Sequence, residues 1–243
     1  MLKRVQNKLR SLGWADTAVF VGARVLSHLS FGTARLVKYY FVAQPVAAAA
    51  RAVSGNAGST HYYMTDAEDA VITQAPRPIK VIRDRFAQRA RCVAASRNDE
   101  LVGFIWLCPQ TYHEDDVRCV YRWTPTPVAE WDFDVYISPP FRMGRLFVRL
   151  WEQAHALLRA QGVAWTLSRV DAFNAESMAV HRKLGAQTLA RGWFLRAGRF
   201  QLALLSVSPY WHFSGREDDC PEVCFDLAEL AAAPSGCVGH RGG

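Results

Sequence analysis

The chain has 243 residues and a formal net charge of +7, half of its residues are hydrophobic, and 21% are charged. This length and composition can bury a core as one large domain or two small ones. No apolar run is long enough to span a bilayer and the N-terminus does not read as a secretory signal, so we expect neither a spanning helix nor a secreted protein.

The six cysteines follow no disulfide-scaffold spacing: Cys92, Cys108, Cys119, Cys220, Cys224 and Cys237. In a chain of this size, scattered cysteines favour a reduced, cytoplasmic protein.

Basic charge is concentrated at the N-terminal end. Residues 1–51 hold eight Lys or Arg against one acid, whereas residues 209–243 hold two Arg against six acids. A basic segment can contact anionic lipid or nucleic acid, but the same charges are typical of a solvated helix face. We favour the solvated face, keep membrane-surface contact by residues 1–51 open, and do not expect nucleic acid as a partner.

The first fifty residues predict helix and then strand. Residues 2–11 and 16–30 carry apolar residues at helical spacing, and residues 35–46 are rich in β-branched and aromatic residues up to Pro45. We expect a basic helical N-terminal extension with a first strand over 1–50, followed by a small, Gly/Ser-rich linker over 47–60.

The centre of the chain alternates strand and helix patterns. The predicted helices span 79–88, 143–161 and 174–184, and the predicted strands span 91–96, 101–109, 117–123, 131–138, 163–170 and a hairpin over 189–207. The fold class is therefore α/β (α+β), a mixed central sheet with helices on both faces, in a domain over 61–208. The unit at 131–170 predicts a right-handed parallel crossover, and residues 209–243 read as an acidic, flexible tail.

The junction at 132–150, DFDVYISPPFRMGRLFVRL, predicts an anion site. A strand ends at the two prolines, and a loop with Arg142, Gly144 and Arg145 leads into a long helix. The free amides of a helix N-terminus and its dipole favour an anion there. The loop is neither a Walker loop nor a dinucleotide fingerprint, and the same residues are equally compatible with a plain helix start.

A second motif follows at 174–186, Asn-x-x-Ser-x-x-x-His-x-x-x-Gly-Ala. Together the two motifs, over about residues 79–207, resemble the GNAT N-acetyltransferase superfamily. The resemblance implies acetyl-CoA as cofactor. It places Asn174 at the start of a helix and on the pantetheine or phosphate arm, with Ser177 on the same face. Phe141 and Leu146 depart from the usual loop residues, so Arg142 and Arg145 are expected to bind more of the phosphate.

The resemblance also implies a set of cofactor-binding residues. They are the end of the strand and the loop that follows it, together with the start of the second motif: Tyr136, Ile137, Arg142, Met143, Gly144, Arg145, Leu146, Asn174 and Ser177.

Three residues are candidates for catalysis. Asp132 and Asp134 alternate along one strand, so they are expected to share a face, where one pKa would rise. We favour Asp134 as the base because it lies nearer the loop. His181 stands where many family members have the tyrosine that protonates the thiolate. The alternatives are a solvated strand face and a packed histidine.

The remaining polar clusters are not expected to bind metal. YHEDD (112–116) reads as a polar turn that could also line an acceptor site, and CPEVC (220–224) has no second ligand pair. The expected function is direct acetyl transfer to a primary amine, either of an amino sugar or of another small molecule. The alternatives are a non-catalytic acyl-CoA-binding or sensing module, and a peripheral membrane or nucleic-acid binder.

Overall fold

The computed structural model describes residues 2–46 and 60–232. The N-terminal segment forms one helix, α1 (Leu2–Leu29), where the sequence suggested two. Just past the end of the helix, Gly32 has a φ of +81° and donates its amide to the Ser27 carbonyl, which closes the last turn. Strand β1 (Ala34–Pro45) then follows, as predicted. The predicted linker falls almost wholly outside the described residues.

The central elements confirm the predicted order. They are β2 (Thr60–Thr65), the 3₁₀ turn η1 (Ile72–Gln74), α2 (Ile79–Ala87), β3 (Arg91–Arg97), β4 (Glu100–Cys108), β5 (Thr111–His113), β6 (Val120–Trp123), β7 (Ala129–Ile137), η2 (Pro139–Phe141), α3 (Leu146–Ala160), β8 (Trp165–Asp171), α4 (Ala175–Lys183), β9 (Gln187–Ala197) and β10 (Phe200–Leu205). Strands β2 and β5 were not predicted.

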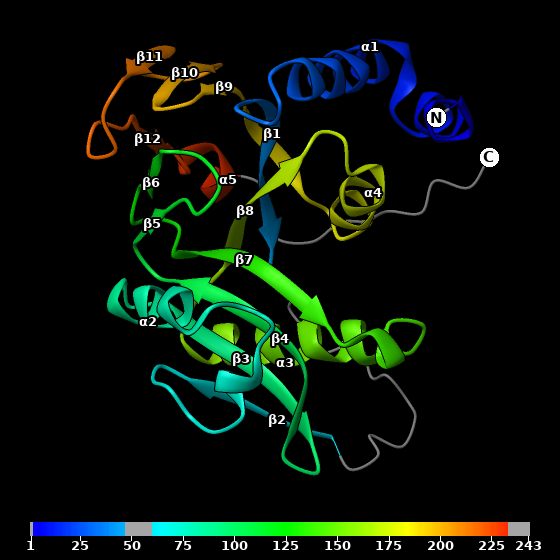
Figure 1. Cartoon of the computed structure of the whole chain (residues 1–243). Helices are drawn as coiled ribbons and strands as arrows, with labels where there is room; N and C mark the ends of the chain where they lie inside the picture. The colour runs from blue at the N-terminus through cyan, green and yellow to red at the C-terminus, as the bar shows by residue number, and fades with distance from the viewer. Residues whose placement is uncertain (1, 47–59, 233–243) are drawn as a thin grey trace, which may run out of the picture.

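Nine strands form one mixed sheet in the order β11-β10-β9-β1-β8-β7-β4-β3-β2 (Figure 1). Strands β7 and β8 pair in parallel across α3, and the other neighbours pair antiparallel. Strand β1 lies between β8 and β9, so the segment read as an extension supplies a central strand. The reason is its composition: Val37, Tyr39 and Phe41 are buried on one face of the sheet.

The two faces of the sheet are covered differently. Helix α3 packs Leu150, Ala154 and Leu158 against Val93 and Ile105 on one face. The opposite face carries α2 and a three-stranded sheet, β12-β6-β5. The predicted strand at 117–123 therefore belongs to this second sheet and does not continue the β3–β4 hairpin.

Residues 209–232, the described part of the expected flexible tail, are folded. They form β11 (Trp211–Ser214), β12 (Glu222–Phe225) and α5 (Ala228–Ala232). Val223 and Phe225 alternate with exposed residues and are buried, because β12 pairs in parallel with β6. Prolines and acids in this segment concealed the short alternation. Residues 233–243 lie outside the described part.

Phe225→Ala should destabilise the fold by about 3–5 kcal/mol, because deleting a buried aromatic ring loses its burial and leaves a cavity. The ring is 3% exposed and lies 5.2 Å, centroid to centroid, from that of Phe41. Denaturant unfolding measures the change. Phe213→Ala is the matched control, since Phe213 is 57% exposed. Equal effects of the two changes would contradict the buried position of β12.

Candidate active site

Strands β7 and β8 separate partway along their length. Their parallel pairing covers only Ala129 to Trp131 against Trp165 to Leu167. Beyond this point the two strand ends run in different directions (Figure 1). Asp132 on β7 and Ser168 on β8 are the next residues, so they flank the apex of the opening.

A bulge interrupts β7 just past this apex. The pairing of β7 with β4 shifts register between Phe104 and Trp106, and Asp134 has a φ of +46°. A bulge adds one residue to a strand and breaks its simple alternation. A positive φ is uncommon at a residue other than glycine and, within a strand, persists only where the surrounding structure fixes it.

Strict alternation predicted that Asp132 and Asp134 share a face of the sheet. That prediction is wrong, because the bulge turns the two side chains to opposite faces. Asp134 contacts Arg85, whose guanidinium lies 5.1 Å from the ring centre of Phe133, so Asp134 points to the α2 face. Asp132 alternates with Phe133 and lies beside Thr166 and Ser168, on the α3 side.

Two guanidinium groups hold Asp134. Arg77 binds both of its carboxylate oxygens, and Arg85 Nη1 donates to Oδ2 at 2.6 Å. Burial alone would raise the pKa of Asp134, but hydrogen bonds from the two arginines outweigh it and lower that pKa below the usual range. Asp134 is therefore a firmly ionised, weak base.

Asp132 is the opposite case. It is 3% exposed and no cation of the described residues pairs with it, so burial raises its pKa to about 7, although hydrogen bonding by the hydroxyls of Thr166 and Ser168 lowers that pKa. Its Oδ2 atom has no hydrogen-bond partner. A buried carboxyl that titrates near neutral pH has the property that a general base requires.

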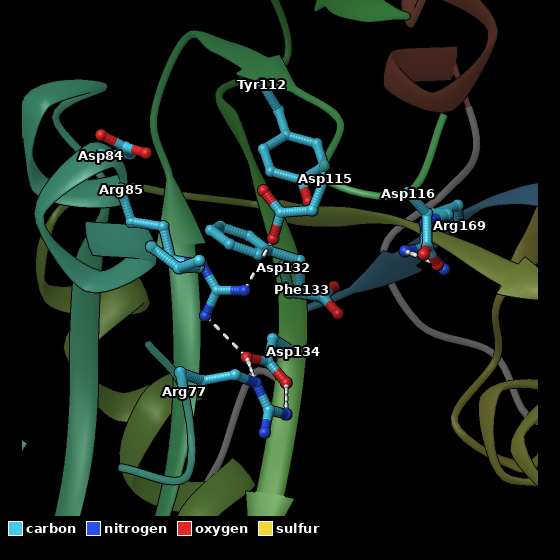
Figure 2. Close-up of a pocket in the computed structure, with 11 residues that line it drawn as sticks. Arg77, Asp84, Arg85, Tyr112, Asp115, Asp116, Asp132, Phe133, Asp134 and Arg169 are labelled. Carbon is cyan, nitrogen blue, oxygen red and sulfur yellow. Dashed lines mark hydrogen bonds and ion pairs between the residues drawn. The ribbon is translucent and has the colours of Figure 1, made fainter. Parts of the chain in front are cut away.

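A cavity of about 700 Å³ opens on the α2 face beside these residues (Figure 2). Its wall holds five carboxylates and three guanidinium groups among a few apolar side chains: Arg77, Val81, Asp84, Arg85, Tyr112, Asp115, Asp116, Asp132, Phe133, Asp134 and Arg169. Tyr112, Asp115 and Asp116 come from the YHEDD segment, which lines this cavity.

The three arginines were missed by sequence reasoning. Arg85 lies on the buried side of α2 with Ile82, three residues earlier, and that helical spacing was its one signal. Arg77 precedes α2 and Arg169 lies on β8, and no pattern in the sequence links them to Asp134 or to Asp116. Their ion pairs span 57 and 53 residues.

Among the described residues, no group of three or more His, Cys, Asp or Glu is arranged to hold a metal ion.

The predicted cofactor residues lie where β7 leads into α3. Ile137 is buried against α3, and Tyr136 stacks on Phe104 on the other face. Within the loop, the Gly144 amide donates to the Phe141 carbonyl and Arg142 Nε donates to the Ile137 carbonyl. These two donors are therefore already used within the loop. The predicted anion site has fewer free donors than the sequence suggested.

A family model for the acetyltransferase (GNAT) family matches residues 57–186, more than half of the chain. The chain belongs to the GNAT acetyltransferase family. No curated protein sequence matches it.

Solved structures similar to this GNAT chain are distant. A conserved protein of unknown function from Staphylococcus epidermidis is 9% identical, with a TM-score of 0.46, 72% of this chain covered and 67% of that one. A tandem GNAT protein of clavulanic acid biosynthesis is 14% identical, with a TM-score of 0.45. The match covers 72% of this chain and 57% of that one. An aminoglycoside acetyltransferase from an uncultured soil sample is 13% identical, with a TM-score of 0.36, covering 52% of this chain and 91% of that one.

The second GNAT motif forms α4 as expected. Asn174 caps the helix through its side chain, which accepts from the Ser177 amide at 3.0 Å. Its predicted contact with the cofactor stays a prediction. Gly185, with a φ of +84°, turns the chain into β9.

His181 faces the sheet from α4. Its Nδ1 lies 3.0 Å from the Oε1 atom of the buried Gln44 on β1. Because an amide oxygen only accepts, Nδ1 carries the proton in this arrangement and Nε2 is left as an acceptor. Burial lowers the pKa of His181, so the ring is neutral at pH 7.

The residues around the β7–β8 opening fit the amide-bearing arm of coenzyme A. Among the described residues of β1, β7 and β8, five polar side-chain atoms on the face toward α3 and α4 are buried without a hydrogen-bond partner: Gln44 Nε2, Glu130 Oε2, Asp132 Oδ2, Thr166 Oγ1 and Ser168 Oγ. Gln44 and Glu130 both pair with Thr166 across the sheet, so three of the five side chains form one row. Buried polar atoms without partners are rare unless a ligand or water satisfies them.

Proposed function

We propose that this GNAT chain is an acetyl-CoA-dependent N-acetyltransferase that acts on a primary amine of a small molecule. One observation carries the proposal. Asp132, whose buried carboxyl has a pKa raised to about 7, stands where the pairing of β7 with β8 ends: its carboxyl lies beside Thr166 and Ser168, and the residue also lines the cavity on the α2 face.

The proposed cofactor contacts follow from the loop and from α4. Arg142 and Arg145 supply positive charge at the start of α3, where the first amides of the helix favour phosphate. Asn174 and Ser177 lie at the start of α4, where they would contact the arm of the cofactor. When bound, acetyl-CoA supplies an activated acyl group as a thioester.

Asp132 is the proposed base, in place of Asp134. An amine in water is an ammonium ion and attacks only after it loses a proton. The Asp132 carboxylate takes that proton. The amine nitrogen would then bond to the acyl carbon as the carbon–sulfur bond breaks. The nitrogen would release its second proton and the thiolate would take up one proton through water, so that the products are the amide and the free thiol while Asp132 keeps the first proton. His181 is neutral, with its proton held toward Gln44, so it accepts at Nε2 and donates only after it has gained a proton.

The charge of the cavity supports a cationic acceptor. Its wall holds more carboxylates than guanidinium groups, and Asp84 and Asp115 at its rim have side chains that are 53% and 38% exposed. The arginines are paired inside the wall, with Asp134, Asp115, Asp116 and Glu114. Asp84 is itself paired with Lys80, so it is the excess of carboxylates over guanidinium groups in the wall that favours an ammonium group.

Two measurements on the full chain test the proposal. Calorimetric titration with acetyl-CoA should show binding, and an amine panel screened for release of free thiol should identify acceptors. The panel includes amino sugars, diamines and amino acids, with matched alcohols as controls. No binding of acetyl-CoA, or thiol release that does not depend on an amine, would contradict the proposed function.

A further inference from the structure

The strained residue of the β7 bulge is held from outside its own strand. Asp134, at a φ of +46°, forms ion pairs with Arg77, from the segment before α2, and with Arg85, from the last turn of α2. Both arginines are distant in sequence from the bulge. A residue in the left-handed region persists only where its surroundings fix it.

Arg85 is the better fixed of the two arginines. Its side chain is 5% exposed and lies against the rings of both Trp106 and Phe133, 5.2 and 5.1 Å from their centres. Its Nη1 donates to Asp134, and its Nη2 donates to Asp115 at 2.6 Å (Figure 2). The fork of one guanidinium group therefore joins α2, the loop after β5, and the bulge.

Two aromatic pairs flank the bulge, and each is contacted by one of the two arginines. Phe133 and Trp106 pair across β7 and β4 on the near side of the register shift, and Tyr136 pairs with Phe104 on the far side. Arg85 packs on the first pair, and Arg77 lies 5.8 Å from the ring centre of Phe104 in the second. The two arginines therefore contact the strand pair on both sides of the bulge.

We infer that Arg85 is a positioning residue for acyl transfer: by binding Asp134 it holds the β7 bulge in its left-handed conformation, and so fixes the backbone next to Asp132 at the apex of the β7–β8 opening. This inference rests on the proposed function. It assigns Arg85 no contact with substrate or cofactor. Its effect passes through Asp134 to the strand that carries the base.

The first test compares Arg85→Ala with Arg83→Ala. Arg83 lies on the same helix, with a 63% exposed side chain that pairs with Glu68 at the surface. Arg85→Ala should lower kcat about 100-fold, while KM for acetyl-CoA changes less than about threefold. Millimolar guanidinium should restore part of kcat, because the vacated site opens on the cavity. Arg83→Ala should behave as wild type.

A second test separates positioning from general stability. Glycine adopts a positive φ without strain, so Asp134→Gly combined with Arg85→Ala should be more active than Arg85→Ala alone. Amide hydrogen exchange at residues 133–136 should be faster in Arg85→Ala and unchanged in Arg83→Ala. If Arg85 served only the general stability of the fold, the added Asp134→Gly change would not restore activity.

The outcomes separate the inference from the proposed function. If Arg85→Ala keeps wild-type kcat, or if the double variant is no better than the single one, the inference is wrong while the function stands. If wild type transfers no acetyl group to any amine, the proposed function fails. Hydrogen exchange then still decides whether Arg85 holds the bulge, because exchange requires no turnover.

Discussion

Asp132→Asn should abolish most of the acetyl transfer while leaving the protein folded. The amide has the size of the carboxyl but takes up no proton from an ammonium group. General base catalysis contributes about 10²–10⁴-fold, so kcat should fall by that range. Folding should tolerate the change, because the carboxyl is buried without a cation and its charged form is already disfavoured.

The pH profile is the sharper readout. The pKa of Asp132 is raised to about 7, so the carboxylate is the minor form below that pH and the major form above it. Wild-type kcat/KM should therefore rise with pH and level off above about 7. The Asn variant should lose this limb and retain a low rate that follows only the ionisation of the acceptor.

Asp134→Asn is the comparison that separates the two carboxylates of β7. Its carboxylate is bound by two arginines and has a lowered pKa. If Asp134 were the base, kcat/KM would therefore rise with pH far below neutral and not near pH 7. If Asp134→Asn removes the limb near pH 7 and Asp132→Asn leaves it, the assignment of the base is wrong. Thermal unfolding of both variants controls for misfolding.

The elements that the sequence predicted share a strong local pattern. Helix α3 carries six buried residues on one face, and Asn174 accepts from the Ser177 amide at the start of α4, as an N-cap does. Such features are fixed within a few residues of chain, so periodicity and capping chemistry are enough to find them. The order of the predicted elements from 79 to 207 is confirmed for the same reason, although the short strand β5 among them was not predicted.

What the sequence did not predict depends on distant partners. Strand β12 is only four residues long and is buried because β6 lies beside it. The residues WDFDVYI of β7 alternate as in a regular strand, so nothing in the sequence indicates the bulge at Asp134. The bulge is seen only in the pairing of β7 with β4. The choice between Asp132 and Asp134 therefore required the fold, since the two carboxyls differ in neighbours that lie 34 to 57 residues away.

Arg169→Met should be the most destabilising of the charge changes at the cavity wall. Arg169 pairs with Glu114 at 2.8 Å, and the Glu114 side chain is fully buried. Removing one partner leaves an uncompensated buried charge, so unfolding at pH 7.5 should become easier by about 3–5 kcal/mol. Arg122→Met is the matched control, since its pair with Glu222 is 50% and 60% exposed and should be worth less than about 1 kcal/mol.

The loss should depend on pH in a defined direction. Burial raises the pKa of Glu114 even beside Arg169, which lowers it, so without the arginine that pKa should rise further. The folded variant then binds a proton that the unfolded chain releases, and its stability falls as pH rises through neutral and recovers toward pH 5. Denaturant unfolding at pH 5 and 7.5 measures this difference. Glu114→Gln combined with Arg169→Met should remove the pH dependence, and a loss equal at both pH values would show that Glu114 is not the group left unpaired.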